Sequence, residues 1–324
     1  MISRRSVVWG LAALAGLKLD RSPASAESYP ARPLTLVVPF AAGGFNDVIV
    51  RIVAQHMSTT LGQSIIIEND AGAGGTTASA RAAHAPADGY TILAGSMGTH
   101  AAAPAQYPNL KYDPARDFTP IGLTAEAPAV IVTRKDFPAN TLAEFVAYVS
   151  ANQGRVNEAH AGVGSQMHTY CSLLQALMGT KTARIAYRGG GPAINDLVAG
   201  QVDFSCVSVN TVVSQIQAGT VKALAIASPE RAEVIGNVPT TIEAGLPAFQ
   251  VSGWNAVFAP KGLPAEIQRR LSEALSKALE DPATVTRLKE IGCIIPESAE
   301  RTPEALKLRV EREVARWSSV LKRD

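Results

Sequence analysis

Short apolar runs, glycine-containing turns and segments of helical period alternate along most of the chain. Each short apolar run predicts a buried strand, and each segment with apolar positions three or four residues apart predicts a helix. The first units are strands at 34–40, 64–68 and 90–94, with helices at 48–61 and 77–85. Strands that alternate with helices in this way are typical of a parallel sheet with helices on both faces.

The same alternation returns in the middle of the chain and changes near the end. The middle part predicts strands at 129–133, 156–160, 183–187, 202–209 and 221–227, with helices at 142–152, 165–178, 192–200 and 211–218. A strand at 251–259 follows, and then helices only, at 264–279, 282–291 and 303–322. We therefore predict an α/β protein of two lobes, 27–128 with 248–324 and 129–247. Two crossovers, near 127–129 and 246–251, form a hinge beside a cleft.

The first 26 residues have the pattern of a cleaved export signal. Arg4 and Arg5 precede an apolar run at 7–17, and an Ala-x-Ala pattern ends at Ala26. The apolar run is too short to span a bilayer. The paired arginines fit a Sec signal and a twin-arginine signal equally well. Either signal predicts a mature chain that starts near Glu27 in the periplasm, with secretion as the less favoured alternative.

The mature chain differs from the full sequence in its net charge. The 324 residues, 47% hydrophobic and 18% charged, are enough for two globular domains and exclude a disordered chain. The formal net charge is +2, but four of the 30 basic residues and one of the 28 acidic residues lie in the export signal. The mature chain has a net charge of −1, so nucleic acid is not an expected partner.

The three cysteines, Cys171, Cys206 and Cys293, have long spacings and no Cys-x-x-Cys pattern. Cys171 falls on the apolar face of a predicted helix and Cys206 in a predicted strand. We expect buried free thiols. A disulfide between Cys171 and Cys206 remains the alternative in an oxidising compartment.

Three loops share one design, in which a strand leads through glycines into the start of a helix. They lie at 40–47, 162–165 and 187–192. Helix N-termini have free N–H groups and a partial positive charge, and they bind anions. A single loop of this kind is more often an ordinary turn. Three of them at strand carboxyl ends, on two lobes, favour an anion site in one cleft.

The sequence gives weaker support for a catalytic, nucleotide-binding or metal site. There is no P-loop and no Gly-x-Ser-x-Gly motif, and the glycines at 72–75 only half resemble a dinucleotide fingerprint. Ser165 and His168 lie three residues apart, but no orienting acid accompanies them, and Ser165 suits a helix N-cap. The five histidines show no metal-ligand spacing. Arg188, beside the third loop, is either a partner for a carboxylate or a solvated surface residue.

The chain resembles the receptors of tripartite tricarboxylate transporters, also called the Bug family of extracytoplasmic solute receptors. Short segments in the family order cover nearly the whole mature chain. They are YPARP (29–33), VPFAAGGFND (38–47), AGAGG (71–75), DGYT (88–91), YDP (112–114), DF (117–118), YRG (187–189), GQVD (200–203), VPT (238–240) and EAGLP (243–247).

The resemblance implies a two-lobe Venus-flytrap fold of the periplasmic binding proteins, type II-like, with mixed sheets, helices on both faces and a central cleft. It implies a binding protein without catalysis, cofactor or metal, which captures small aliphatic or aromatic mono- or dicarboxylates. A tripartite membrane permease is the implied partner, a signalling receptor is the alternative, and we expect a monomer. The site residues are Phe40, Ala42, Gly43, Gly44, Asn46, Asp47, Gly75, Ser96, Thr99, His100, Gly162, Gly164, Ser165, His168, Tyr187, Arg188, Gly189 and Ser208.

Two departures from the family pattern bear on the ligand. Asn46 stands where the family often has threonine, which changes one donor near the first carboxylate. The strand end at 207–210 has valine, serine, valine and asparagine, where the family often has an acid or asparagine. An acid there would suit a cationic amino group, so its absence favours a carboxylate ligand without an amino group. A hydrolase using Ser165 and His168, or an oxidoreductase using 72–75, stays the alternative from another class.

Overall fold

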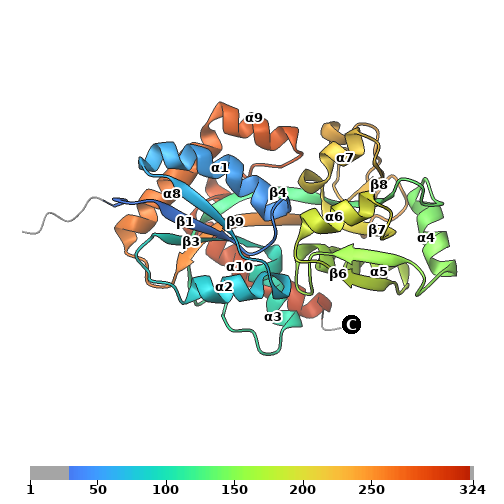
Figure 1. Ribbon diagram of the computed structural model, residues 1–324, viewed down its shortest axis with the longest axis horizontal. Helices are drawn as coiled ribbons and strands as arrows, with labels where there is room; N and C mark the ends of the chain where they lie inside the picture. Colours follow the sequence, from blue (N-terminus) through green and yellow to red (C-terminus); the bar gives the residue numbers. More distant parts are fainter. Residues whose placement is uncertain (1–28, 322–324) are drawn as a thin grey trace, which may run out of the picture.

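The computed structural model describes residues 29–321. The predicted export signal over 1–26 lies outside the described residues. The chain forms a mixed α/β fold of two lobes, which Figure 1 shows side by side along the long axis. None of the helices described between 29 and 321 is long and apolar enough to cross a membrane.

The first lobe contains the start and the end of the described chain. Its strands are β1 (Leu34–Val38), β2 (Ile65–Asn69), β3 (Thr91–Ser96) and β9 (Ser252–Pro260), with the first part of β4 (Phe118–Arg134). Its helices are α1 (Phe45–Leu61), α2 (Thr76–Ala83), α3 (Ala103–Gln106), α8 (Ala265–Glu280), α9 (Pro282–Glu290) and α10 (Pro303–Leu321). A π-helical turn, η2 (Gly98–Ala102), and the short 3-10 turns η1 (Ala73–Gly75) and η5 (Ser298–Glu300) complete it.

The second lobe is formed by the middle of the chain. Its strands are β5 (Asn157–His160), β6 (Ala183–Ala186), β7 (Phe204–Ser208) and β8 (Val221–Ile226), with the last part of β4. Its helices are α4 (Leu142–Ala151), α5 (Gln166–Met178), α6 (Gly190–Val198) and α7 (Val213–Gln217), with the 3-10 turns η3 (Val209–Thr211) and η4 (Glu233–Ile235). Ser165 caps α5 by accepting a hydrogen bond from the His168 backbone N–H at 3.2 Å, and Gly179 ends this helix in the left-handed conformation.

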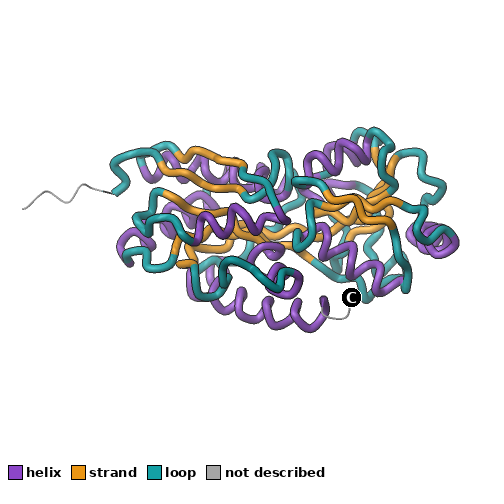
Figure 2. Tube along the Cα trace, turned by 60° about the horizontal axis from the view of Figure 1, so that its bottom comes forward, coloured by secondary structure: helices purple, strands orange, loops and turns teal. Residues whose placement is uncertain are grey.

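The long strand β4 joins the two lobes. Between Phe118 and Pro128 it pairs antiparallel with β9, and from Ala129 onward it pairs with β7 and β8. The strand order is β2-β1-β3-β9-β4-β7-β5-β6, with β8 also on β4. Figure 2 shows the strands running through both lobes between the covering helices. A strand shared in this way holds the lobes together and leaves a cleft between their loops.

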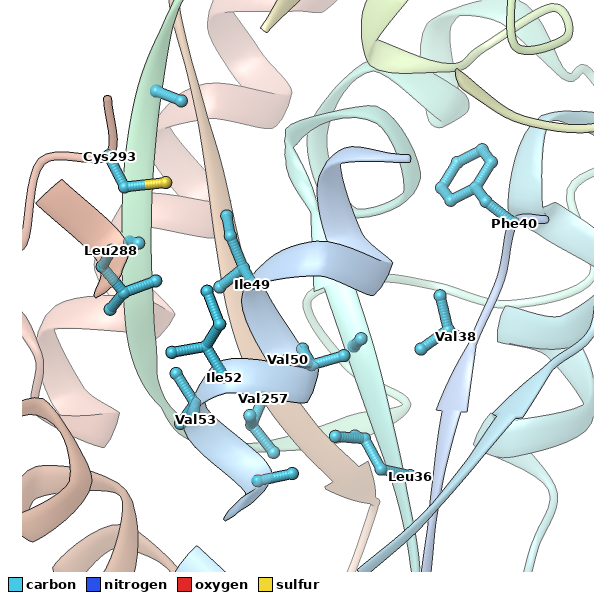
Figure 3. Close-up of a cluster of buried hydrophobic side chains, with 14 of the residues drawn as sticks. Leu36, Val38, Phe40, Ile49, Val50, Ile52, Val53, Val257, Leu288 and Cys293 are labelled. Carbon is cyan, nitrogen blue, oxygen red and sulfur yellow. The ribbon is translucent and has the colours of Figure 1, made fainter. Parts of the chain in front are cut away.

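Two apolar cores, one on each face of the sheet, continue through both lobes. One lies under α1, α8 and α6, and the other under α2, α5 and α10. Figure 3 shows Ile49, Ile52 and Val53 of α1 in the first core, beside Leu288 of α9 and Cys293. All three cysteines are buried and free, as expected, and the Cys206 backbone N–H donates to Cys171 Sγ at 3.2 Å.

The structure extends the predicted elements in one important place. The sequence predicts a strand at 129–133, whereas the observed β4 starts at Phe118. Pro120, Gly122 and Pro128 interrupt the apolar pattern before Ala129, so this part of the sequence does not look like a strand. Its pairing with β9, far away in the sequence, stabilises it all the same.

Candidate functional site

A small cavity of about 30 Å³ lies between the two lobes. This volume is well below the roughly 300–1,000 Å³ of ligand pockets, and the two lobes meet closely around it. Every side chain that lines it is neutral. The lining residues are Phe40, Gly44, Phe45 and Asn46 of the first lobe and Ala161, Ser165, Gln166, Met167, Gly190, Val207, Ser208 and Thr211 of the second.

Three helices start at this cavity. Gly44 is the N-cap of α1, Ser165 the N-cap of α5, and Gly190 the first residue of α6. No side chain caps α1 or α6, so their first N–H groups have no acceptor within the helix or from a cap. Because each helix dipole adds partial positive charge, the three N-termini together favour an anion without any charged side chain.

Neutral polar groups add directional donors and acceptors. Asn46, 3% exposed, donates from Nδ2 to the Ala94 carbonyl at 2.9 Å, which fixes its amide at the start of α1. Across the cavity, Ser208 is 2% exposed. Thr211 Oγ1 is buried and has no hydrogen-bond partner among residues 29–321. These hydroxyls are donors that a carboxylate can accept from.

Hydrogen bonds to Asp47 hold the loop that leads into α1 in place. Asp47, 3% exposed, accepts hydrogen bonds from the Gly43 N–H, Arg51 Nε and Asn69 Nδ2, each at 2.9 Å. Burial alone would raise the pKa of the Asp47 carboxyl, but these hydrogen bonds outweigh it and lower the pKa. Asp47 is therefore ionised and holds the loop; its oxygens are already occupied by the protein.

The lobes touch each other around the cavity through glycine-rich loops. The Ala41 N–H donates to the Arg188 carbonyl at 3.1 Å, and a Cβ added to Gly191 would overlap the Ala42 carbonyl oxygen. Gly74, with φ of +62°, lies so close to the Val163 carbonyl that a side chain has no room. Glycine at these positions lets two backbones meet over the cavity.

A second pair of contacts closes the same side of the cleft. Tyr107 donates its hydroxyl to the Val163 carbonyl at 2.6 Å, and the Gly164 N–H donates to Gln106 Oε1 at 3.0 Å. Tyr107 and Gln106 belong to the first lobe, whereas Val163 and Gly164 belong to the second. The structure is therefore the closed form of a two-lobe receptor fold.

A groove of about 360 Å³ elsewhere in the molecule differs in character. It lies between α8 and the segment 298–304 on the first lobe, away from the cleft. Its lining includes Arg269 and Glu273, which already pair with each other. The charges of Arg269 and Glu273 are therefore already paired. The helices α1, α5 and α6 start at the cleft and not at this groove.

A family model described as "Tripartite tricarboxylate transporter family receptor" matches residues 49–323. The chain belongs to this family. Among curated relatives, BugT of Bordetella pertussis is 35% identical over 302 residues, with 93% of this chain and 92% of that protein covered. The resemblance to the Bug receptors is thereby confirmed.

Solved structures of the family share the fold. MatC of Rhodopseudomonas palustris, with bound malate, is 44% identical with a TM-score of 0.88, covering 90% of this chain and all of MatC. Rpa4515 of R. palustris, with adipate, is 32% identical with a TM-score of 0.86, covering 91% of this chain and 97% of that chain. The chain is thus a two-lobe receptor, as its segments predicted.

In this receptor, the residues expected at the site fall into two groups around the cavity. Phe40, Gly44, Asn46, Ser165 and Ser208 line it. The second group supports the lining or the contact between the lobes: Ala42, Gly43, Asp47, Gly75, Gly162, Gly164, Arg188 and Gly189, of which Gly75 packs on Phe40. Arg188 contributes its carbonyl, and its side chain is exposed.

The structure does not bring the remaining expected residues to the cavity. Tyr187 donates its hydroxyl to Asp196 at 2.7 Å. The His168 ring lies beside His160, with the ring centroids 4.8 Å apart. Ser96, Thr99 and His100 are fully buried; Thr99 Oγ1 bonds to Ser96 N and His100 Nδ1, and the His100 ring stacks on Phe258 at 4.0 Å. These side chains contact residues of their own lobe and are not part of the cavity lining.

Several residues line the cavity but are not among the site residues expected from the sequence. They are Phe45, Ala161, Gln166, Met167, Gly190, Val207 and Thr211. Most are apolar or belong to a regular helix, and nothing in their type marks a ligand contact. Gln166 and Thr211 do have a signal. Gln166 directly follows Ser165, which was recognised as an N-cap, and Thr211 directly follows the strand end at 207–210.

The buried His100 predicts a pH dependence of folding. Burial lowers its pKa to about 3, whereas an unfolded histidine titrates near about 6.5. Below pH 6.5 the unfolded chain binds a proton that the folded chain does not, so stability is lost as the pH falls. The free energy of unfolding should decrease between pH 7 and pH 5, and this decrease should be about 1–2 kcal/mol smaller in His100→Gln than in the wild type. Denaturant titrations at the two pH values measure it. Equal losses in the two proteins would contradict this assignment.

Proposed function

We propose that this receptor captures a small aliphatic dicarboxylate between its lobes and does not transform it. The observation that carries the proposal is the meeting of three helix N-termini at one neutral cavity. One carboxylate would accept from the first N–H groups of α1 and α6, and the other would face the unpartnered Thr211 hydroxyl. The malate in MatC and the adipate in Rpa4515 support a dicarboxylate, and the higher identity to MatC favours one close to malate in length.

The absence of an acid from the cavity lining supports a ligand without an amino group. A buried ammonium needs an ionised partner, because an unpaired charge is costly to bury. Ser208 lies at the strand end where such an acid would stand, and all other lining side chains are neutral. We therefore expect succinate-like acids to bind and their 2-amino analogues to bind poorly.

The environment of Ser165 and His168 supports binding without turnover. Ser165 Oγ accepts from the His168 backbone N–H and not from its ring. The imidazole Nε2 lies 3.5 Å from the Arg184 guanidinium, and burial lowers the pKa of His168 to about 3. A ring held in this way does not take a proton from the Ser165 hydroxyl.

Membership of the family supports a proposal for the location and the partner of the receptor. We propose that the protein acts in the periplasm as a monomer and delivers its ligand to a tripartite membrane permease. We also propose the lobe limits 27–128 with 248–324, and 129–247. The change of partner along β4 at Pro128 and Ala129 supports these limits.

A thermal-shift panel of carboxylates tests the proposal. A ligand that binds only the folded protein adds about 2.7 kcal/mol of stability at a hundredfold excess over Kd. Malate or succinate should raise Tm, and aspartate should raise it little. A panel without any shift from four- to six-carbon dicarboxylates would sink the proposal, and so would turnover of any acid that binds.

Tyr107→Phe is expected to weaken binding without changing specificity. The variant loses the hydroxyl that donates to the Val163 carbonyl across the cleft. One such hydrogen bond contributes about 1 kcal/mol, so affinity should fall about fivefold, chiefly through faster release. Stopped-flow measurement of association and dissociation checks this. A change in the order of preference among acids would show that Tyr107 touches the ligand, against this interpretation.

A further inference from the structure

The side-chain amide of Gln166 is buried at the cavity, and only its nitrogen is hydrogen-bonded. It is the first residue of α5, is 6% exposed and lines the cavity. Its Nε2 donates to Tyr170 Oη at 2.6 Å and to Ser208 Oγ at 2.7 Å. In this orientation both amide hydrogens meet hydroxyl oxygens, so the nitrogen is fully satisfied.

The other half of the amide has no partner. Gln166 Oε1 is buried and accepts no hydrogen bond from any residue between 29 and 321. An unpaired buried acceptor costs free energy unless a donor from a ligand or a water reaches it. A carboxylate carries no proton and cannot supply that donor, whereas a hydroxyl on the carbon chain of the ligand can.

Both lobes hold this amide in position. A Cβ added to Gly253 of β9 would overlap the Gln166 amide and the Tyr170 hydroxyl, and a Cβ on Gly98 would lie 2.8 Å from the Gln166 backbone nitrogen. Gly253 pairs with Ala127 next to the crossover, so the first lobe closes against Gln166 directly. The acceptor is thus rigid in the closed form, which is what discrimination between similar ligands requires.

The neighbouring hydroxyl completes the arrangement. Ser208 Oγ accepts from Gln166 and lies 3.3 Å from Tyr170 Oη. If Tyr170 donates to Ser208, the Ser208 proton is left for the cavity that Ser208 lines. A ligand hydroxyl would then donate to Gln166 Oε1 and accept from Ser208 at the same time.

We propose that Gln166 is a specificity-determining residue that selects a 2-hydroxydicarboxylate over the same acid without the hydroxyl. Gly253 is the residue that positions it. The proposal rests on the proposed function, because it assumes a dicarboxylate in the cavity. It adds the chemical group by which this receptor distinguishes one dicarboxylate from another.

Calorimetric titration with succinate and with each enantiomer of malate tests this inference. The acids differ only in the hydroxyl and its orientation. A site that pairs with a ligand hydroxyl disfavours the analogue that lacks it, so one enantiomer should bind at least about tenfold tighter than succinate. Gln166→Met should reduce this ratio to about twofold or less, because it removes the acceptor and retains the bulk of the side chain.

Two further variants complete the design. Gly253→Ala should also abolish the preference, since it displaces the amide, and Gln201→Met makes the same substitution at an exposed position of the second lobe and should retain the preference. Equal affinity of the wild type for succinate and both enantiomers of malate would overturn the inference, as would a full preference in Gln166→Met. In both cases binding of succinate would leave the proposed function standing. Failure of the wild type to bind these three acids or any dicarboxylate of up to six carbons would instead refute the proposed function.

Discussion

Gly191→Ala is expected to lower ligand affinity at least about 100-fold while the fold stays intact. The added methyl group would overlap the Ala42 carbonyl oxygen, which belongs to the opposite lobe. Gly191 lies in the first turn of α6 and is not in the left-handed region, so alanine strains neither the helix nor the separate lobe. Ligand affinity scales with the fraction of receptor that can close. A steric overlap at this contact reduces that fraction and therefore raises Kd.

Calorimetry and thermal denaturation separate the two effects. Gly191→Ala should unfold at the same temperature as the wild type without ligand, or slightly higher, and should lose the stabilisation by ligand. Asn195→Ala, an exposed position of the same helix, is the matched control and should bind as the wild type does. Wild-type affinity in Gly191→Ala would show that closure at these loops is not part of binding.

Asn46→Asp should abolish dicarboxylate binding more completely still. The two side chains have nearly the same shape, but the new carboxylate would lie at the start of α1, where we expect a ligand carboxylate. Two like charges about 4 Å apart repel by about 4 kcal/mol at an effective dielectric constant near 20. That corresponds to a loss of about 1,000-fold in Kd.

The fold should tolerate this change at moderate cost. Asn46 loses its hydrogen bond to the Ala94 carbonyl, but an acid in the first turn of a helix is favourable. Asn109→Asp adds the same charge at an exposed position of the first lobe and should leave Kd unchanged. Titrations of both variants with one dicarboxylate check the prediction. Tight binding by Asn46→Asp would place the ligand carboxylate elsewhere.

The local elements of this fold follow closely from the sequence, and the long-range pairing does not. The start of α5 is predictable because Ser165 caps it, and its end because Gly179 takes the left-handed conformation there. The first part of β4 is not predictable, because Pro120 and Gly122 interrupt its pattern and its partner β9 lies far away in the chain. Contacts of that kind depend on the assembled sheet and leave no local trace.

The site shows the same division. The rule that a glycine-rich loop after a strand binds anions correctly singles out Gly44, Asn46 and Ser165 as cavity residues. The rule does not predict which side of α5 faces the cavity. His168 is expected at the cavity but packs beside His160, whereas Gln166 lines the cavity although the sequence does not predict it. The orientation of a helix between two lobes is decided by packing, in this case by Gly98 and Gly253 of the other lobe.

A crystal structure with a bound four-carbon dicarboxylate would show directly how the ligand is held. We expect one ligand in the cavity between the lobes, with a carboxylate within about 3 Å of N–H groups in the first turns of α1 and α6. We also expect that no charged side chain of the protein touches that carboxylate. A ligand held by an arginine or lysine, or bound outside the space between Asn46, Ser165 and Ser208, would contradict this mode of binding.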